Sequence, residues 1–127
     1  SQLTELLKQM ISGRQTVDLV DRINAYVDEH YMDQIGINTI ADMIDISPNY
    51  LSRIYKLKTG ENFIEYLTRT RMRQACVCLR NPDYSIKQIC AMVGYSDPNY
   101  FSRIFKKYEG VNPSEYRERM ENGAGKA

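Results

Sequence analysis

Two stretches of the chain repeat the same polar side chains at the same spacing: Asn49, Ser52, Arg53 and Lys56 in the first, and Asn99, Ser102, Arg103 and Lys106 in the second. On a helix, residues three and four positions apart share one face. Arginine can bond to both acceptors of guanine, asparagine to both groups of adenine, and serine to several bases. Lysine supplies a point charge that suits a phosphate group. If both stretches are helical, each has the chemistry to bind base edges and phosphates of a nucleic acid duplex.

An apolar stripe accompanies each polar face and predicts the helix that positions it. The stripe follows the i, i+3, i+4 spacing of a buried helix face, with Leu51, Ile54 and Tyr55 in the first stretch and Phe101, Ile104 and Phe105 in the second. A capping residue followed by proline is typical of a helix start. Such a pair opens each stretch, as Ser47-Pro48 and as Asp97-Pro98.

Both helices belong to a module that the chain contains twice. Residues 40–66 and 89–116 are identical at 14 of 27 aligned positions when Asp97 is treated as one extra residue. A short apolar helix comes first in each copy, with Ile40, Ala41, Met43 and Ile44 in one and Ile89, Cys90, Met92 and Val93 in the other. A small residue followed four positions later by a turn residue is the helix-turn-helix pattern. The pairs that fit it are Ala41 with Asp45 and Cys90 with Gly94.

The segments around the two copies predict further helices and no strand. Residues 62–80 form one long expected helix, whose apolar side is Ile64, Leu67, Ala75, Cys78 and Leu79. Capping residues precede three helices, as Asn62 with Glu65, Ser85 with Gln88, and Asn112 with Glu115. In front of the first copy, a helix of about 15 residues carries Val20, Ile23, Val27 and Tyr31 on one face.

The expected fold class is therefore all-α, with about seven helices. Two helix-turn-helix subdomains are joined by the long central helix, and an amphipathic segment with Leu3, Leu6, Leu7, Met10 and Ile11 precedes them. We expect four parts: a linker or helical segment from a preceding domain at 1–15, the first subdomain with the connecting helix at 16–80, the second subdomain at 81–119, and a disordered tail at 120–127.

Composition and charge narrow the class of protein. Hydrophobic residues make up 43% and charged residues 26% of the chain, which excludes a collagen-like or wholly disordered protein. No apolar run is long enough to span a membrane, and no secretion signal opens the sequence. The net charge of +1 hides an asymmetry, since residues 1–46 carry −5 and residues 47–127 carry +6. This asymmetry indicates a polyanionic partner for the second part.

The sulfur and imidazole groups predict no catalytic or metal chemistry. Cys76, Cys78, Cys90 and the single His30 form neither a zinc-binding pattern nor a disulfide framework. We therefore expect no metal, no cofactor and no catalytic residue, and a reducing cytoplasm as the compartment. Cys90 is interpreted as a small apolar residue where two helices cross. His30 is interpreted as a cation at a helix end.

Residues 17–119 resemble the DNA-binding domain of the AraC/XylS family of bacterial transcription regulators. The most specific stretch runs over residues 86–117 and includes Ala91-Met92-Val93-Gly94-Tyr95, Tyr100-Phe101-Ser102-Arg103, Phe105-Lys106-Lys107, Gly110, Pro113, Tyr116 and Arg117. The central helix also fits the family, with Phe63, Tyr66, Leu67, Arg71 and Ala75. The resemblance implies two recognition helices that enter successive major-groove segments on one face of DNA.

The resemblance also implies the residues that contact DNA. Base-reading residues would be Asn49, Ser52, Arg53, Pro98, Asn99, Ser102 and Arg103. Phosphate contacts, which set affinity and salt dependence, would come from Lys56, Lys58, Lys106 and Lys107. Backbone N–H groups at 37–39 and 86–88, at two expected helix starts, are further phosphate candidates. Arg71 matches a family position at which arginine is structural.

Competing roles exist for several of these side chains. Arg53 and Arg103 could instead pair with nearby acids and stabilise the fold. Tyr50 and Tyr100 are interpreted as helix packing rather than base stacking. Cys76 and Cys78 are interpreted as ordinary helix residues.

Promoter DNA is the expected partner, together with RNA polymerase, a preceding sensory or receiver domain, and a second copy of the chain on DNA. The apolar face of residues 3–11 is expected either to pack on the domain or to pair with another chain. The segment around residues 30–67 resembles, in particular, family members that are two-component response regulators. No membrane partner is expected for this segment.

Two other functions compete with DNA binding. A basic helical protein-interaction module would bind an acidic partner and ignore DNA sequence. An alkyl-transfer enzyme with a zinc-bound cysteine is disfavoured, because the cysteines lie inside expected helices without a four-cysteine cluster.

Overall fold

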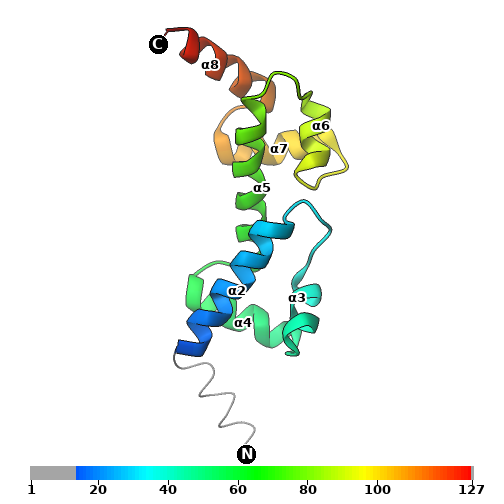
Figure 1. The fold of residues 1–127 in the computed structure, drawn as a ribbon, viewed down its shortest axis with the longest axis vertical. Helices are drawn as coiled ribbons and strands as arrows, with labels where there is room; N and C mark the ends of the chain where they lie inside the picture. Colours follow the sequence, from blue (N-terminus) through cyan, green and yellow to red (C-terminus); the bar gives the residue numbers. More distant parts are fainter. Residues whose placement is uncertain (1–13, 127) are drawn as a thin grey trace, which may run out of the picture. The chain divides into compact units, whose positions relative to one another are not determined.

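The structure is a computed structural model that describes residues 14–126, and in this range the chain is all-α (Figure 1). Its helices are α2 (Arg14–His30), α3 (Ile37–Ile44), α4 (Pro48–Thr59), α5 (Phe63–Leu79), α6 (Ile86–Met92), α7 (Pro98–Glu109) and α8 (Pro113–Lys126). The expected fold class and the seven expected helices are confirmed. The predicted amphipathic segment at residues 3–11 lies outside the described residues.

The helices form two compact units. Among the described residues, the first unit contains 14–30 and 35–67, and the second contains 31–34 and 68–126. Each unit holds one copy of the repeated module. The central helix α5 contributes its first residues to the first unit and the rest to the second.

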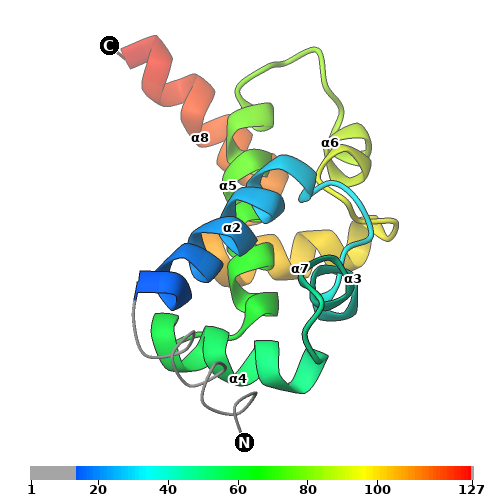
Figure 2. The same cartoon turned by 60° about the horizontal axis from the view of Figure 1, so that its bottom comes forward.

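In the first unit, α2 and α3 both pack on α4 (Figure 2). The predicted stripe of α4 is buried, with Leu51, Ile54 and Tyr55 at most 6% exposed. Burying a side chain of this size stabilises a fold by about 1.5–3 kcal/mol. The Tyr55 hydroxyl is not left unpaired in this core, because it donates a hydrogen bond to Oδ1 of Asn24 at 2.8 Å. The stripe therefore directs the opposite face of α4 to solvent.

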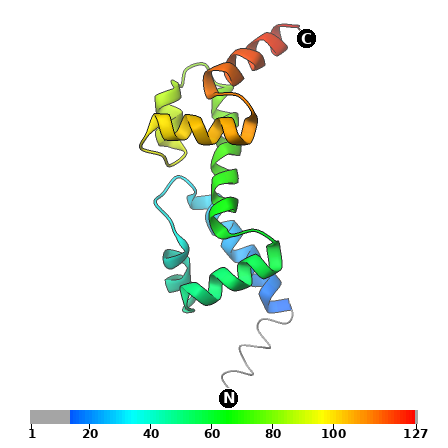
Figure 3. The ribbon, with the colours of Figure 1, turned by 180° about the vertical axis from the view of Figure 1, so that it is seen from behind.

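In the second unit, α7 packs on both α6 and α8 (Figure 3). Phe101 and Phe105 are fully buried, together with Met72, Ala75, Leu79, Ile89, Cys90 and Val93. Ile104, predicted to be buried, is only partly so and packs against the edge of this cluster. The buried face of α7 is thus narrower than that of α4, and the rings of Phe101 and Phe105 form its centre.

The turns and helix starts follow the sequence predictions. Asp45 and Gly94 both adopt the left-handed backbone, with φ values of 60° and 103°. The side chains of Ser47 and Asp97 accept backbone hydrogen bonds at the starts of α4 and α7, at 3.1 and 3.0 Å. Ser85 and Gln88 form the expected reciprocal cap in front of α6. Each module is therefore confirmed as a helix, a tight turn and a second helix.

Other details also differ from the predictions. Ile64 was placed on the buried side of the central helix, yet it is 58% exposed, and Phe63 is buried in its place because it packs edge-on against Tyr55. Met43 and its counterpart Met92 were placed on the apolar faces of α3 and α6, but they are 60% and 37% exposed. α8 continues to Lys126, where a tail without regular structure was expected from residue 120. No proline interrupts this last segment, so its backbone can continue the helical hydrogen bonds.

Candidate nucleic-acid interface

The first candidate face lies on the solvent side of α4. Asn49, Ser52 and Arg53 are all exposed there, in the first two turns of the helix. Pro48 at the first helical position and the Ser47 cap fix where the helix begins. Because the buried stripe faces the opposite way, these three side chains share one accessible surface.

The second candidate face lies on α7 in the same register. Asn99 and Arg103 are exposed, whereas Pro98 and Ser102 are half-buried. The backbone N–H of Asn99 donates to Oδ1 of Asp97 at 3.0 Å, and its side chain remains at the surface. The structure therefore brings the predicted residues together within each unit, four on α7 and three on α4.

The four predicted phosphate-binding lysines lie towards the C-terminal ends of these helices. All are exposed: Lys56, Lys58, Lys106 and Lys107. Cations there also interact favourably with the carbonyl end of the helix dipole, by about 0.3–1 kcal/mol each. A structural contribution and a phosphate contact are compatible, because the ammonium groups stay in solvent.

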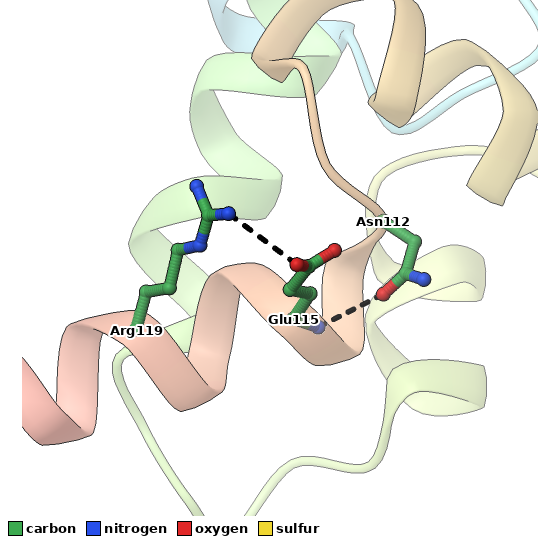
Figure 4. Close-up of polar contacts among 3 residues, drawn as sticks. All are labelled: Asn112, Glu115 and Arg119. Carbon is green, nitrogen blue, oxygen red and sulfur yellow. Dashed lines mark hydrogen bonds and ion pairs between the residues drawn. The ribbon is translucent and has the colours of Figure 1, made fainter.

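The structural role that competed with base reading for Arg53 and Arg103 was an ion pair with a nearby acid. Among the side chains described, neither forms an ion pair with a carboxylate. An ion pair is found instead on α8, where Nη2 of Arg119 lies 3.3 Å from Oε1 of Glu115 (Figure 4). In the same figure the backbone N–H of Glu115 donates to Oδ1 of Asn112 at 2.8 Å, which is the predicted cap of α8. The charges of Arg53 and Arg103 are therefore available to a ligand.

Arg71 has the structural role that its position implied. It is only 9% exposed, its Nε donates to the carbonyl oxygen of Tyr31 at 2.7 Å, and its Nη2 donates to that of Asp33 at 2.8 Å. Sequence reasoning did not identify a second arginine of this kind, Arg117. Its Nε and Nη2 donate to the carbonyl oxygens of Leu79 and Asn81, both at 3.1 Å. The first bond satisfies the carbonyl of Leu79, the last residue of α5, and the second adds to the hydrogen bond that the carbonyl of Asn81, in the following turn, accepts from the N–H of Tyr84.

The two helix starts proposed to bind phosphate differ. α3 begins at Ile37, and its N-cap residue Gly36 makes no side-chain cap, so no capping side chain occupies the first N–H groups of the helix. At α6, however, the N–H of Gln88 already donates to Oγ of Ser85 at 3.0 Å. The expectation for Gln88 is therefore wrong, because its own cap uses the group.

The cysteines are shielded thiols. Burial raises the pKa of Cys78 and Cys90, and it raises the pKa of Cys76 to about 11, although the hydroxyl of Tyr116 opposes part of that rise. Within the described part of the chain, no three His, Cys, Asp or Glu side chains are arranged to hold a metal ion. No described helix has both the length and the apolarity needed to cross a membrane.

Comparison with known proteins gives one consistent result. A family model described as a helix-turn-helix domain matches residues 40–119. The chain is 32% identical, over 87% of its length, to the Msm operon regulatory protein of Streptococcus mutans and covers 40% of that protein. For the first three curated relatives, which are all named as regulators or activators, the covered share is between 31% and 40%. The chain thus spans less than half the length of these relatives.

Two solved structures share the fold at considerable sequence identity. One is the C-terminal domain of AraT, a response regulator from Geobacillus stearothermophilus, with a TM-score of 0.76 and 37% identity over 79% of this chain and 84% of that one. The other is the C-terminal domain of the two-component response regulator YesN from Fusobacterium nucleatum, with a TM-score of 0.75 and 33% identity over 79% of this chain and 98% of that one.

Proposed function

The chain belongs to the AraC/XylS family of helix-turn-helix transcription regulators, and from that premise we propose that α4 and α7 are recognition helices that bind specific double-stranded DNA. The family is one of transcription regulators and not of enzymes. In this proposal each unit inserts one helix into the major groove, and the two grooves are successive segments of the same duplex.

One observation carries the proposal: asparagine, serine, arginine and lysine recur at the same positions of two helices that each follow a helix-turn-helix turn, and all of these residues are exposed except Ser102, which is half-buried. A surface that only faces solvent does not need the same polar residues at the same positions of two helices. Two helices that each read a DNA groove do need the same polar residues at the same positions, because the first turns of a recognition helix contact base edges.

The roles divide by chemistry. Arg53 and Arg103 have the forked donors that pair with guanine, and Asn49 and Asn99 have the amide that pairs with adenine. Ser52 and Ser102 bond to neighbouring bases or to the backbone, and Pro98 lies at the end of α7 that enters the groove. Lys56, Lys58, Lys106 and Lys107 bind phosphates and supply affinity that is independent of sequence.

We further propose that a regulatory domain precedes this one in the whole protein. Two facts support this: the curated relatives are more than twice as long as the chain, and two similar structures are C-terminal domains of response regulators. A receiver domain is therefore the proposed neighbour. Contact with RNA polymerase and pairing of two copies on promoter DNA belong to the same proposal.

The test is a comparison of affinities. A binding site is first selected from a randomised pool of double-stranded DNA, and dissociation constants are then measured for that site and for a scrambled duplex of the same composition. A specific binder prefers its own site by about 10³-fold or more at physiological salt. Equal affinity for both duplexes would contradict sequence-specific binding and would favour the alternative, a basic protein-interaction module.

A further inference from the structure

The second unit contains a column of cations and aromatic rings that ends on the face of α7. Cζ of the buried Arg71 lies 5.1 Å from the ring centroid of Tyr95. The rings of Tyr95 and Tyr100 have centroids 5.9 Å apart, and Cζ of Arg103 lies 6.0 Å from the centroid of Tyr100. Each separation is in the range of cation–π or aromatic contacts. A guanidinium fixed in the core is thus connected through two rings to the guanidinium exposed on α7.

The inner end of this column makes several contacts within the second unit. Arg71 is fixed by its hydrogen bonds to two carbonyl oxygens. Tyr95 also contacts Phe101 of the core, with ring centroids 5.7 Å apart. Burial raises the pKa of Tyr95, although the Arg71 cation opposes the rise, so this phenol stays neutral at physiological pH. Tyr100 therefore contacts a ring that packs on both Arg71 and the core, whereas 46% of its own surface is exposed.

The first unit repeats the outer residues of the column but not its support. Tyr50 and Arg53 have the same i, i+3 spacing as Tyr100 and Arg103, but Ile46 occupies the position that corresponds to Tyr95. Among the described contacts, no cation–π pair joins Arg53 to Tyr50. The two units therefore differ in what contacts the arginine of the recognition face, although Asn, Ser, Arg and Lys recur there at the same positions.

We propose that Tyr100 is a positioning residue that orients the guanidinium of Arg103 before DNA binds, so that specificity at the base Arg103 reads depends on the Tyr100 ring. The inference rests on the proposed function, since it takes Arg103 as a base-reading residue. An arginine side chain loses rotamer freedom when it binds in one geometry. A contact that restricts the side chain beforehand reduces that loss, and preorganisation of this kind favours the correct base contact. Arg53, without a supported ring, has no such preorganisation.

The experiment measures base preference one position at a time. Duplexes that carry the selected site are substituted at single base pairs, and the position whose preference is lost in Arg103→Ala is identified first. The preference at that position is then measured for Tyr100→Leu, for Tyr100→Phe and for the matched variant Tyr50→Leu. Tyr100→Leu is expected to reduce it about two- to fivefold, the range that one exposed cation–π contact provides. Tyr100→Phe keeps the ring and should retain it, and Tyr50→Leu should leave that position unchanged.

A double variant separates positioning from a direct contact of Tyr100 with DNA. If Tyr100 acts through Arg103, adding Tyr100→Leu to Arg103→Ala changes the preference at that position no further. A loss as large in Tyr100→Phe as in Tyr100→Leu, or an equal loss at every base pair, would overturn the proposal, because either points to the hydroxyl or to general affinity.

The proposal and the proposed function fail in different ways. Specificity that depends on Arg103 but is indifferent to Tyr100→Leu would overturn the positioning role alone. Specificity that is indifferent to Arg103→Ala would remove both. Because Tyr100 is half-exposed, Tyr100→Leu should fold, which far-ultraviolet circular dichroism checks. If it does not, nuclear Overhauser effects between the Tyr100 ring and the Arg103 side chain in the free wild-type protein decide the matter: their presence supports the column, and their absence overturns it.

Discussion

Two kinds of cation lie next to each other on α7, and we expect them to contact different parts of a duplex. Arg103 has a planar fork of donors that matches the two acceptors of a guanine, whereas Lys106 presents a compact charge without a fixed bonding direction. Both are exposed, so exposure does not distinguish their roles. The chemistry of the two side chains distinguishes their roles, and it predicts opposite effects on specificity and on salt dependence.

Replacing Arg103 should damage discrimination. Arg103→Ala is expected to cost about 1–3 kcal/mol with the cognate base and to flatten the preference at that base pair, because the bidentate contact is lost. The measurement is a set of dissociation constants for duplexes substituted at single positions. Arg103→Lys is the matched control, since it keeps the charge without the fork: it should lose the preference but retain the salt dependence. An unchanged ratio of cognate to non-cognate affinity in Arg103→Ala would refute base reading by this residue.

Replacing Lys106 should weaken binding without changing preference. Lys106→Ala is expected to lower affinity for all sequences alike and to reduce the slope of log affinity against log salt by about one, because one phosphate contact disappears. Titrations at several salt concentrations measure that slope. Lys106→Arg keeps the charge and should keep the slope. A change confined to a single base pair would instead indicate that Lys106 reads sequence.

The thiols should react slowly in the folded protein. Burial raises the pKa of Cys76 from 9.0 to about 11, and only the thiolate is alkylated at an appreciable rate. The folded state therefore holds this proton more tightly than the unfolded state. The stability that the neutral thiol contributes is fully present below pH 9 and is lost as the pH rises through about 11.

Alkylation followed by mass spectrometry tests this expectation. At pH 8, iodoacetamide should label Cys76 more slowly in native than in urea-unfolded protein, and the native rate should keep rising beyond pH 9. Equal rates in the two states at pH 8 would contradict the raised pKa.

At the scale of the elements, the two modules build the same turn with different residues. Asp45 and Gly94 both have a left-handed backbone, which glycine adopts freely and aspartate tolerates. The glycine position has an additional constraint, since a Cβ atom at Gly94 would lie 3.0 Å from Cζ and Nε of Arg71. In the turn of the second unit, a larger residue would therefore have to displace Arg71 as well as adopt a strained backbone angle.

Substitutions in these turns should differ in effect. Gly94→Ala is expected to lower the free energy of unfolding by about 1–3 kcal/mol, through backbone strain and the displacement of Arg71. Asp45→Gly in the first unit is the matched control. It relieves strain without a new contact and should change stability by less than about 1 kcal/mol. Urea denaturation measures both variants. A Gly94→Ala protein as stable as the wild type would show that Arg71 can move at no cost.

Local signals in the sequence predicted where the helices begin and end better than they predicted how the helices pack. The caps at Ser47, Ser85 and Asp97 depend only on residues two to three positions away, so they could be predicted from spacing alone. The exposure of Ile64 could not, because it follows from Phe63 packing against Tyr55 in another helix.

The polar faces of α4 and α7 were also predictable, because the repeat shows the same residues twice in one register. The bonds from Arg117 to Leu79 and Asn81 were not, since they join residues at least 36 positions apart. The contact between the rings of Tyr95 and Tyr100 likewise depends on how the chain folds, so it could not be predicted from residue spacing.

At the scale of the whole chain, duplication accounts for the organisation of the protein. Each unit has its own core and its own recognition helix, and the basic charge is concentrated in residues 47–127, which contain both helices. A duplicated DNA-binding module gains affinity when both copies bind one duplex, because the second contact is made at a high effective concentration. The central claim is that the two units read separate parts of one site.

Selection of binding sites with three proteins tests this claim most directly. The wild type, Arg53→Ala and Arg103→Ala are each used to select duplexes from the same randomised pool, and the enriched sequences are compared by position. The account predicts two blocks of preference with centres about 10–10.5 base pairs apart, of which Arg53→Ala flattens one and Arg103→Ala the other. A single block, or one block flattened by both variants, would contradict it.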